Sequence, residues 1–175
     1  PDRANSVLFS AVGSARARIV VIGTPGPEMC RLLEFLRSLT IEHVLFSDLI
    51  QNERDRRTPS GFAFEKAERS GVSASDEITM AVARRWFWSR KNGCGFVLEG
   101  FPRNLTQALV LDEWLEARGE TLDQVVHLAG SGVSDRETDL VVEYYEGQSI
   151  LFRIEPGDLD RAVRVNDAPE VALLP

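Results

Sequence analysis

The chain has 175 residues, 43% of them hydrophobic, and a net charge of −7. This size and composition suit one well-packed domain, and the acidic balance argues against nucleic acid or an anionic membrane as a partner. No apolar run reaches the length of a membrane span, the chain start lacks a signal-peptide pattern, and the two cysteines have no metal-ligand spacing. We therefore expect a cytoplasmic protein with reduced cysteines.

Five short apolar runs, rich in β-branched residues, predict strands at Arg18–Ile22, His43–Phe46, Phe96–Glu99, Val125–Leu128 and Ile150–Ile154. Apolar residues at helical spacing predict helices at Pro27–Leu39, Asp76–Arg90, Leu105–Arg118 and Asp135–Tyr145. The polar stretch Gln51–Ser60 is typical of a solvated loop. Apolar strands that alternate with helices predict a parallel sheet covered on both faces, and hence a three-layer α/β domain.

We assign this domain to residues 18–175. Residues 1–17 come before the first expected strand and contain one apolar patch, Val7-Leu8-Phe9. We expect them to form an N-terminal extension that packs on the domain or provides the contact for a protein partner.

Two loops that follow expected strands carry distinctive residues. The first reads Gly23-Thr24-Pro25-Gly26-Pro27-Glu28-Met29-Cys30-Arg31. The second, with the strand before it and the helix start after it, reads Gly95-Phe96-Val97-Leu98-Glu99-Gly100-Phe101-Pro102-Arg103-Asn104-Leu105-Thr106-Gln107-Ala108. They resemble two motifs of the adenylate kinase family, the P-loop variant Gly-x-Pro-Gly-x-Gly-Lys-Gly-Thr and the segment Gly-Phe-(apolar)₂-Asp-Gly-Phe-Pro-Arg-Thr-x-x-Gln-Ala.

The resemblance covers roughly Arg18 to Asp167. It implies a three-layer P-loop-type α/β domain with a five-stranded parallel sheet in the spatial order 2-3-1-4-5, flanked by helices. The first strand should be central, and the two distinctive loops should lie side by side at its carboxyl end, where open α/β sheets bind ligands.

The resemblance also implies a site for AMP or another nucleoside monophosphate. Arg103 matches the arginine that grips the AMP phosphate, and Gln107 matches the glutamine that reads the adenine edge. Gly100 is expected to contribute backbone to the nucleotide site. Glu99 replaces the aspartate that helps hold magnesium through water, which makes it a weak metal candidate. The second phosphate-binding arginine of the family is Gln51 here, so the AMP side is half retained.

A helical segment at about residues 47–77 is similar to the mobile part of the family that closes over AMP. Asp48 matches the aspartate of that segment, and the backbone near Val72 and Ala74 would face the adenine. After the fourth expected strand, the family inserts a lid whose arginines cover the triphosphate. That lid is reduced or absent here, near residues 130–138.

The P-loop motif matches only in its first half. Gly23 and Gly26 match glycines that let an anion approach the backbone. The later family residues, a glycine, the lysine and the magnesium-binding threonine, are Glu28, Met29 and Arg31. Glu28 adds a repelling charge, Met29 cannot neutralise phosphate, and Arg31 offers no hydroxyl to a metal. We expect no ATP or magnesium site here and assign no catalytic residue.

The leading interpretation is an adenylate kinase-like pseudoenzyme with a partial AMP pocket. Two alternatives stay open. One is a weakly active nucleotide kinase that transfers phosphate from ATP to a nucleoside monophosphate, with Arg31 in place of the lysine. The other is a structural or partner-binding domain, in which Arg103 and Gln107 are ordinary polar residues at a helix N-terminus.

Overall fold

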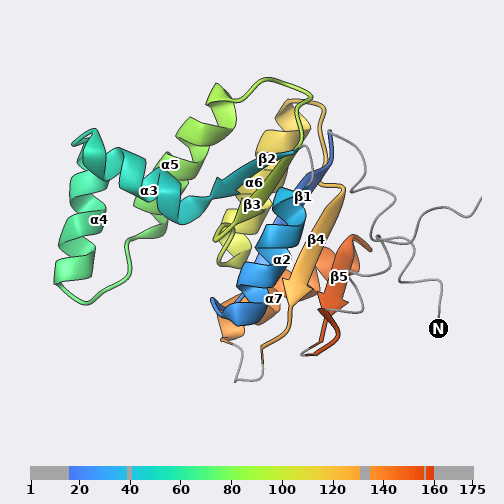
Figure 1. The fold of residues 1–175 in the computed structure, drawn as a ribbon. Coiled ribbons are helices and arrows are strands. Elements are labelled where there is room, and N and C mark those ends of the chain that lie inside the picture. The colour runs from blue at the N-terminus through green and yellow to red at the C-terminus, as the bar shows by residue number, and fades with distance from the viewer. Residues whose placement is uncertain (1–15, 39–40, 131–134, 156, 160–175) are drawn as a thin grey trace, which may run out of the picture.

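The computed structural model describes residues 16–38, 41–130, 135–155 and 157–159. One five-stranded sheet carries the fold, with all its paired strands parallel and the order β2-β3-β1-β4-β5 (Figure 1). The strands are β1 (Arg18–Gly23), β2 (Glu42–Leu45), β3 (Phe96–Glu99), β4 (Gln124–Leu128) and β5 (Leu151–Ile154). The order and the central place of β1 confirm the predicted topology.

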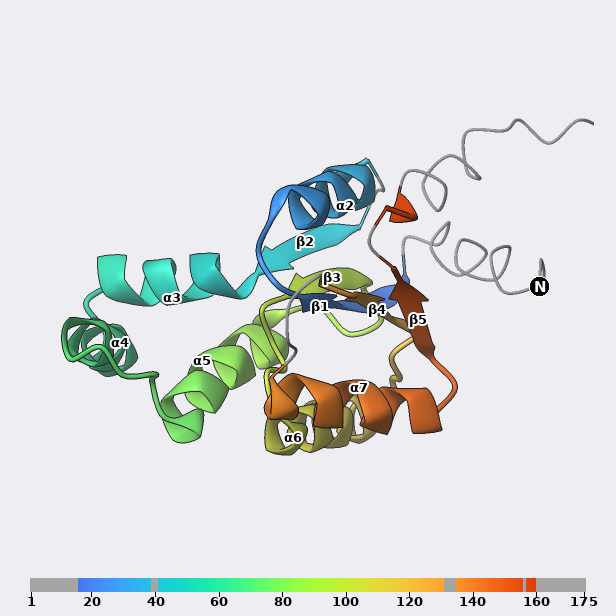
Figure 2. The same ribbon diagram turned by 90° about the horizontal axis from the view of Figure 1, so that it is seen from below.

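Helices cover both faces of the sheet. They are α2 (Pro27–Arg37), α3 (Phe46–Asp55), α4 (Pro59–Arg69), α5 (Asp76–Ser89), α6 (Leu105–Ala117) and α7 (Arg136–Gly147). Figure 2 shows α2 on one side of the sheet and α6 and α7 on the other. Helices α3 and α4 extend away from the sheet and α5 leads back to it (Figure 1). The predicted three-layer arrangement is therefore confirmed.

The alternation of side chains along β1 explains the two cores. Successive residues of a strand point to opposite faces. Ile19 and Val21 pack with the buried face of α2, whereas Val20 and Ile22 pack with buried residues of α5, α6 and α7. Because both faces are covered, the strand is apolar almost throughout, which is what the sequence pattern indicated.

The expectation of a loop at Gln51–Ser60 is wrong. Helix α3 continues to Asp55 and α4 begins at Pro59, so only residues 56–58 lie between the two helices. The buried carboxylate of Glu53 holds this corner, because it accepts hydrogen bonds from Thr58 and from Arg85 of α5. Thr58 also caps α4 by accepting a hydrogen bond from the backbone N–H of Gly61, at 3.1 Å.

Some expected features lie outside the described residues. These are residues 1–15 of the N-terminal extension, residues 131–134 of the reduced lid and the chain after residue 159. Asp135 caps the start of α7, where its side chain accepts a hydrogen bond from the backbone N–H of Thr138. In the described ranges, every helix is too short or too polar for a membrane crossing.

Candidate functional site

Three connections leave the sheet at the carboxyl ends of β1, β2 and β3. In the parallel pairs, Val21 of β1 and Leu45 of β2 both lie beside Glu99 of β3. The turn after β1, the start of α3 and the loop between β3 and α6 therefore begin close together. This is the carboxyl edge of an open α/β sheet, the usual place for a ligand. The expected juxtaposition of the loops after β1 and β3 is present.

Met29, in the first turn of α2, packs its side chain beneath the turn that follows β1. Its side chain is only 3% exposed and belongs to the apolar core beneath α2. A Cβ atom placed on Gly23 would lie 2.8 Å from the Cε of Met29 and 2.8 Å from the carbonyl oxygen of Leu128. Gly23 is therefore needed for close packing inside the protein, and Met29 serves as a core residue.

Glu28 is engaged by the protein itself. Its carboxylate accepts a hydrogen bond from the backbone N–H of Gly157 at 3.2 Å, and it lies 3.9 Å from the guanidinium of Arg31. This ion pair spans one turn of α2, as i, i+3 spacing allows. Gly26, just before the helix, has an extended backbone, and a Cβ atom placed on it would meet no atom within 4 Å. Sterics in this state do not require a glycine there.

The loop after β3 is shaped by close packing against α3. Gly100 has φ +83°, a conformation that strains other residues, and a Cβ there would lie 3.2 Å from the Cβ of Phe46. The rings of Phe46 and Phe101 stack with centroids 5.4 Å apart, and both are buried. The peptide bond between Phe101 and Pro102 is cis. From this buried packing the chain runs outward, so that Arg103 lies at the surface.

Arg103 lies just before α6 and Gln107 lies in its first turn, but the two side chains differ in their exposure to solvent. The side chain of Arg103 is exposed, whereas Gln107 is only 2% exposed. The Oε1 of Gln107 accepts a hydrogen bond from the backbone N–H of Arg103 at 2.9 Å. Its Nε2 donates to Asp76 at 2.7 Å. The two residues that the sequence placed in one pocket are therefore joined through the loop backbone.

Asp76 and Asn104 are two site residues that the sequence motifs did not single out. Asn104 caps α6 by accepting a hydrogen bond from the backbone N–H of Gln107 at 3.0 Å. Its Nδ2 donates to both carboxylate oxygens of Asp76, at 2.9 and 3.0 Å. Asp76 is the first residue of α5, so it ties the N-termini of α5 and α6 together. The only sequence signal was a carboxylate after the helix cap Ser75.

Three charged groups influence one another at this edge. Burial raises the pKa of Glu99, the positive charge of Arg103 lowers it, and the negative charge of Asp48 raises it further. Glu99 is half-buried, and Asp48 is exposed at the start of α3. Among the described residues, no three His, Cys, Asp or Glu side chains gather in a way that could hold a metal ion.

The remaining predicted positions lie between α4 and α5. Val72 is 60% exposed, and Ala74 is half-buried against the core. Both residues lie in the short connection before α5, which begins at Asp76. Val72 therefore faces solvent, and Ala74 contacts the core.

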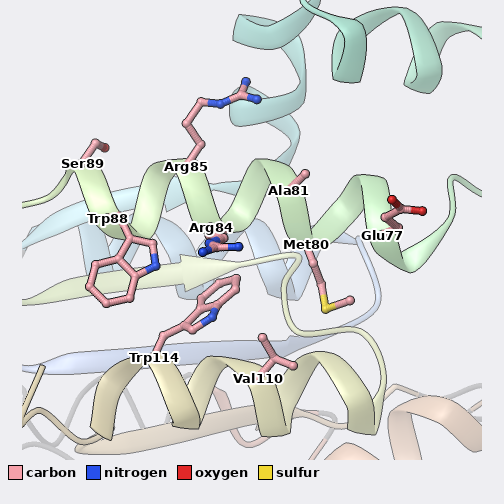
Figure 3. Close-up of a pocket in the computed structure, with 9 residues that line it drawn as sticks. All are labelled: Glu77, Met80, Ala81, Arg84, Arg85, Trp88, Ser89, Val110 and Trp114. Carbon is pink, nitrogen blue, oxygen red and sulfur yellow. The ribbon is translucent and has the colours of Figure 1, made fainter. Parts of the chain in front are cut away.

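A separate groove of about 1000 Å³ runs between α5 and α6 (Figure 3). Its walls are formed by Glu77, Met80, Ala81, Arg84, Arg85, Trp88, Ser89, Val110 and Trp114. Figure 3 shows Arg85 pointing away from the groove, toward the helices before α5. That side chain pairs with Glu53. The groove shares none of its lining residues with the predicted nucleotide positions.

Comparison with known proteins gives consistent relatives, although the chain matches no protein-family model. Adenylate kinase of Moorella thermoacetica is 34% identical over 112 residues, which are 63% of this chain and 52% of the relative. Adenylate kinase of Streptomyces coelicolor is 36% identical over 143 residues, 79% of this chain and 61% of the relative.

Adenylate kinase of Xylella fastidiosa is 31% identical over 133 residues, 75% of this chain and 68% of the relative. The chain thus spans between about half and two thirds of the length of these three relatives. With the sheet order and the two loop motifs, these identities show that the chain belongs to the adenylate kinase family.

Proposed function

We propose that this chain is a pseudoenzyme of the nucleoside monophosphate kinase type, which binds AMP at the loop after β3 and does not transfer phosphoryl groups. The burial of Met29 carries this proposal. In the family motif this position holds the lysine that neutralises phosphate charge. Here the side chain is turned into the core and lies against Gly23, so the loop offers a triphosphate no cation from this position.

The other losses act on the same ligand. Phosphoryl transfer depends almost entirely on positioning and charge neutralisation, because the transferred group needs no covalent help from the protein. Glu28 places a carboxylate in the loop, and Arg31 supplies no hydroxyl for a magnesium ion. The residues present therefore do not fit a magnesium-bound triphosphate. Removing one preorganised donor already costs about 2.7–4 kcal/mol in well-studied sites.

The lid is the third loss. Residues 129–135 join β4 directly to α7, which leaves no room for a lid flanked by helices. An arginine supplied over the transferring phosphate can be worth about 10³–10⁵ in rate. A triphosphate bound here would stay open to water on that side, and water exclusion is one purpose of such lids.

The monophosphate side keeps its two main recognition groups. The exposed guanidinium of Arg103 can form a two-pronged contact with a phosphate, and the amide of Gln107 is held at the base of the same loop. We further propose that the segment at about 47–77, which includes α3 and α4, closes over the bound nucleotide. We keep 18–175 as one domain and 1–17 as an extension.

A weakly active kinase would need Arg31 to replace the missing lysine. The ion pair between Arg31 and Glu28 weighs against this, because the carboxylate offsets part of its charge. The test is a coupled assay of ADP formation from ATP, magnesium and AMP, with an adenylate kinase such as that of Xylella fastidiosa as positive control. We expect no magnesium-dependent turnover above the protein-free blank. Clear turnover would overturn the pseudoenzyme proposal and favour the weak kinase.

A further inference from the structure

The amide of Gln107 is held in one orientation by two different partners. Its Oε1 faces a donor, the backbone N–H of Arg103, at 2.9 Å. Its Nε2 faces an acceptor, the carboxylate of Asp76, at 2.7 Å. A flipped amide would place Oε1 against a carboxylate and Nε2 against an N–H group. Both contacts would then be repulsive, so the two partners together determine the orientation.

This orientation matters for reading a base. A primary amide has two N–H donors and an oxygen with two acceptor sites, so Gln107 keeps one N–H and one lone pair for a ligand. A 6-aminopurine presents an amino donor beside a ring-nitrogen acceptor, and these pair with the oxygen and the N–H of the amide, respectively. A 6-oxopurine presents the reverse pair, an oxygen acceptor beside a ring N–H, and needs the flipped amide.

We propose that Asp76 is a positioning residue that sets base selectivity, by holding Gln107 in the orientation that reads adenine and rejects a 6-oxopurine. The inference rests on the proposed AMP site. Asp76 acts through Gln107, without needing to touch the nucleotide.

The structure makes Asp76 a firm anchor. Asn104 donates to both of its carboxylate oxygens while capping α6, so the carboxylate is held from two directions. Gln107 is buried, which leaves its amide little freedom to exchange these partners for water. A site whose polar groups are fixed in this way rejects a mispaired ligand strongly, because the wrong base leaves donors and acceptors unpaired.

The matched test variants are Asp76→Asn and Glu77→Gln. Both remove one negative charge from the first turn of α5 with almost no change in shape, so both lose the same favourable interaction with the helix dipole. Only the first touches Gln107. Glu77 is exposed and borders the groove between α5 and α6 (Figure 3). An asparagine at position 76 can accept from, or donate to, either orientation of the Gln107 amide.

Calorimetric titration with AMP and with inosine monophosphate measures the selectivity of each protein. We expect the parent to prefer AMP by about 100-fold, because a mispaired base leaves a buried donor and a buried acceptor without partners. In Asp76→Asn this ratio should fall by about tenfold or more, partly because the affinity for inosine monophosphate rises. Glu77→Gln should keep the parent ratio. A purely structural role of Asp76 would lower both affinities together and leave the ratio unchanged.

The outcomes separate the two proposals. If the parent binds AMP and the ratio is the same in Asp76→Asn, the inference on selectivity is overturned and the proposed AMP site stands. If the parent binds neither nucleotide, the proposed site fails and the inference fails with it. Melting temperatures of the variants show whether each is folded, and Asp76→Ala serves as a second variant if Asp76→Asn does not fold.

Discussion

The loop after β1 and the loop after β3 leave the same edge of the sheet and both begin with residues of the family motif, but their side chains then follow different courses. After β1, Met29 turns into the core and Glu28 binds to Gly157 and Arg31. After β3, Arg103 stays at the surface. The residues after β1 pack against the protein itself, whereas the loop after β3 exposes a cation, to which we assign the phosphate of the proposed AMP site.

Under the proposed function, the difference illustrates how a site can be lost while its fold is kept. A core position tolerates an apolar side chain of suitable size, and Met29 adds packing where the family motif has a charged group. Under the proposed function, a methionine in place of the family's lysine removes a phosphate contact while its side chain packs into the core. In the loop after β3, Gly100 and Phe101 make the packing contacts. Arg103 is not needed for packing, so replacing it with an apolar residue would add no contact to the core.

The largest effect is expected at Met29. Met29→Ala should lower the free energy of unfolding by about 2–5 kcal/mol, the usual cost of removing a buried large side chain. Met29→Lys should destabilise the domain too, since it buries an ammonium group without a partner. Urea denaturation measures both, and Cys30→Ala, at the exposed next position, should change stability by less than about 0.5 kcal/mol. A Met29→Lys variant as stable as the parent would show that the loop still accommodates the lysine.

The next effect distinguishes the two arginines. Arg103→Ala should weaken AMP binding by about 1.5–3 kcal/mol, the scale of a hydrogen bond to a charged group. Arg31→Ala, its counterpart in the helix that follows the loop after β1, should leave the AMP affinity unchanged. Calorimetric titration of both variants gives the comparison. The reverse result would place the monophosphate at the loop after β1.

The free energy of unfolding should depend on pH through the ionisation of Glu99. Burial raises the pKa of Glu99 above its ordinary value of 4.5, with Asp48 adding to the rise and Arg103 opposing it. Between pH 4.5 and the raised pKa, the native state binds more protons than the unfolded state, so stability falls as the pH rises through this window. Above the raised pKa, the folded protein carries the full cost of holding Glu99 ionised in a half-buried place.

Glu99→Gln removes this penalty. The variant should be more stable than the parent at neutral pH, and the advantage should vanish as the pH falls below 4.5. Urea titrations at neutral pH and below pH 4.5 measure the difference. Glu113→Gln is the control, because Glu113 is exposed and is not among the groups that shift the pKa of Glu99. An advantage of the same size at both pH values would show that ionisation of Glu99 has no part in it.

Most of the fold could be predicted from the sequence, because periodicity and motifs report local structure directly. The apolar spacing that predicted the helix at Pro27–Leu39 agrees with the burial of Met29, Leu32, Leu33 and Leu36 on one face of α2. The resemblance predicted a helical segment at about 47–77, but the charged residues of Gln51–Ser60 gave no local sign that helix continues through most of that stretch. Glu53 is buried despite its charge because it accepts hydrogen bonds from the nearby Thr58 and from the distant Arg85, and no local pattern reveals the second partner.

The candidate site was less predictable. The motifs identified Arg103 and Gln107, but the partners of Gln107 depend on how α5 meets α6. Asp76 is 31 positions away from Gln107 along the chain, so no local pattern links them. The contact of Met29 with Gly23 and Leu128 likewise requires the packed structure.

The central claim is that this domain keeps the monophosphate side and has lost the triphosphate side. Calorimetric titration of the unmodified chain with AMP, and separately with ATP and magnesium, tests it most directly. We expect a saturable heat of binding with AMP and none with ATP and magnesium over the same concentration range. Binding of ATP and magnesium as tight as that of AMP would contradict the account.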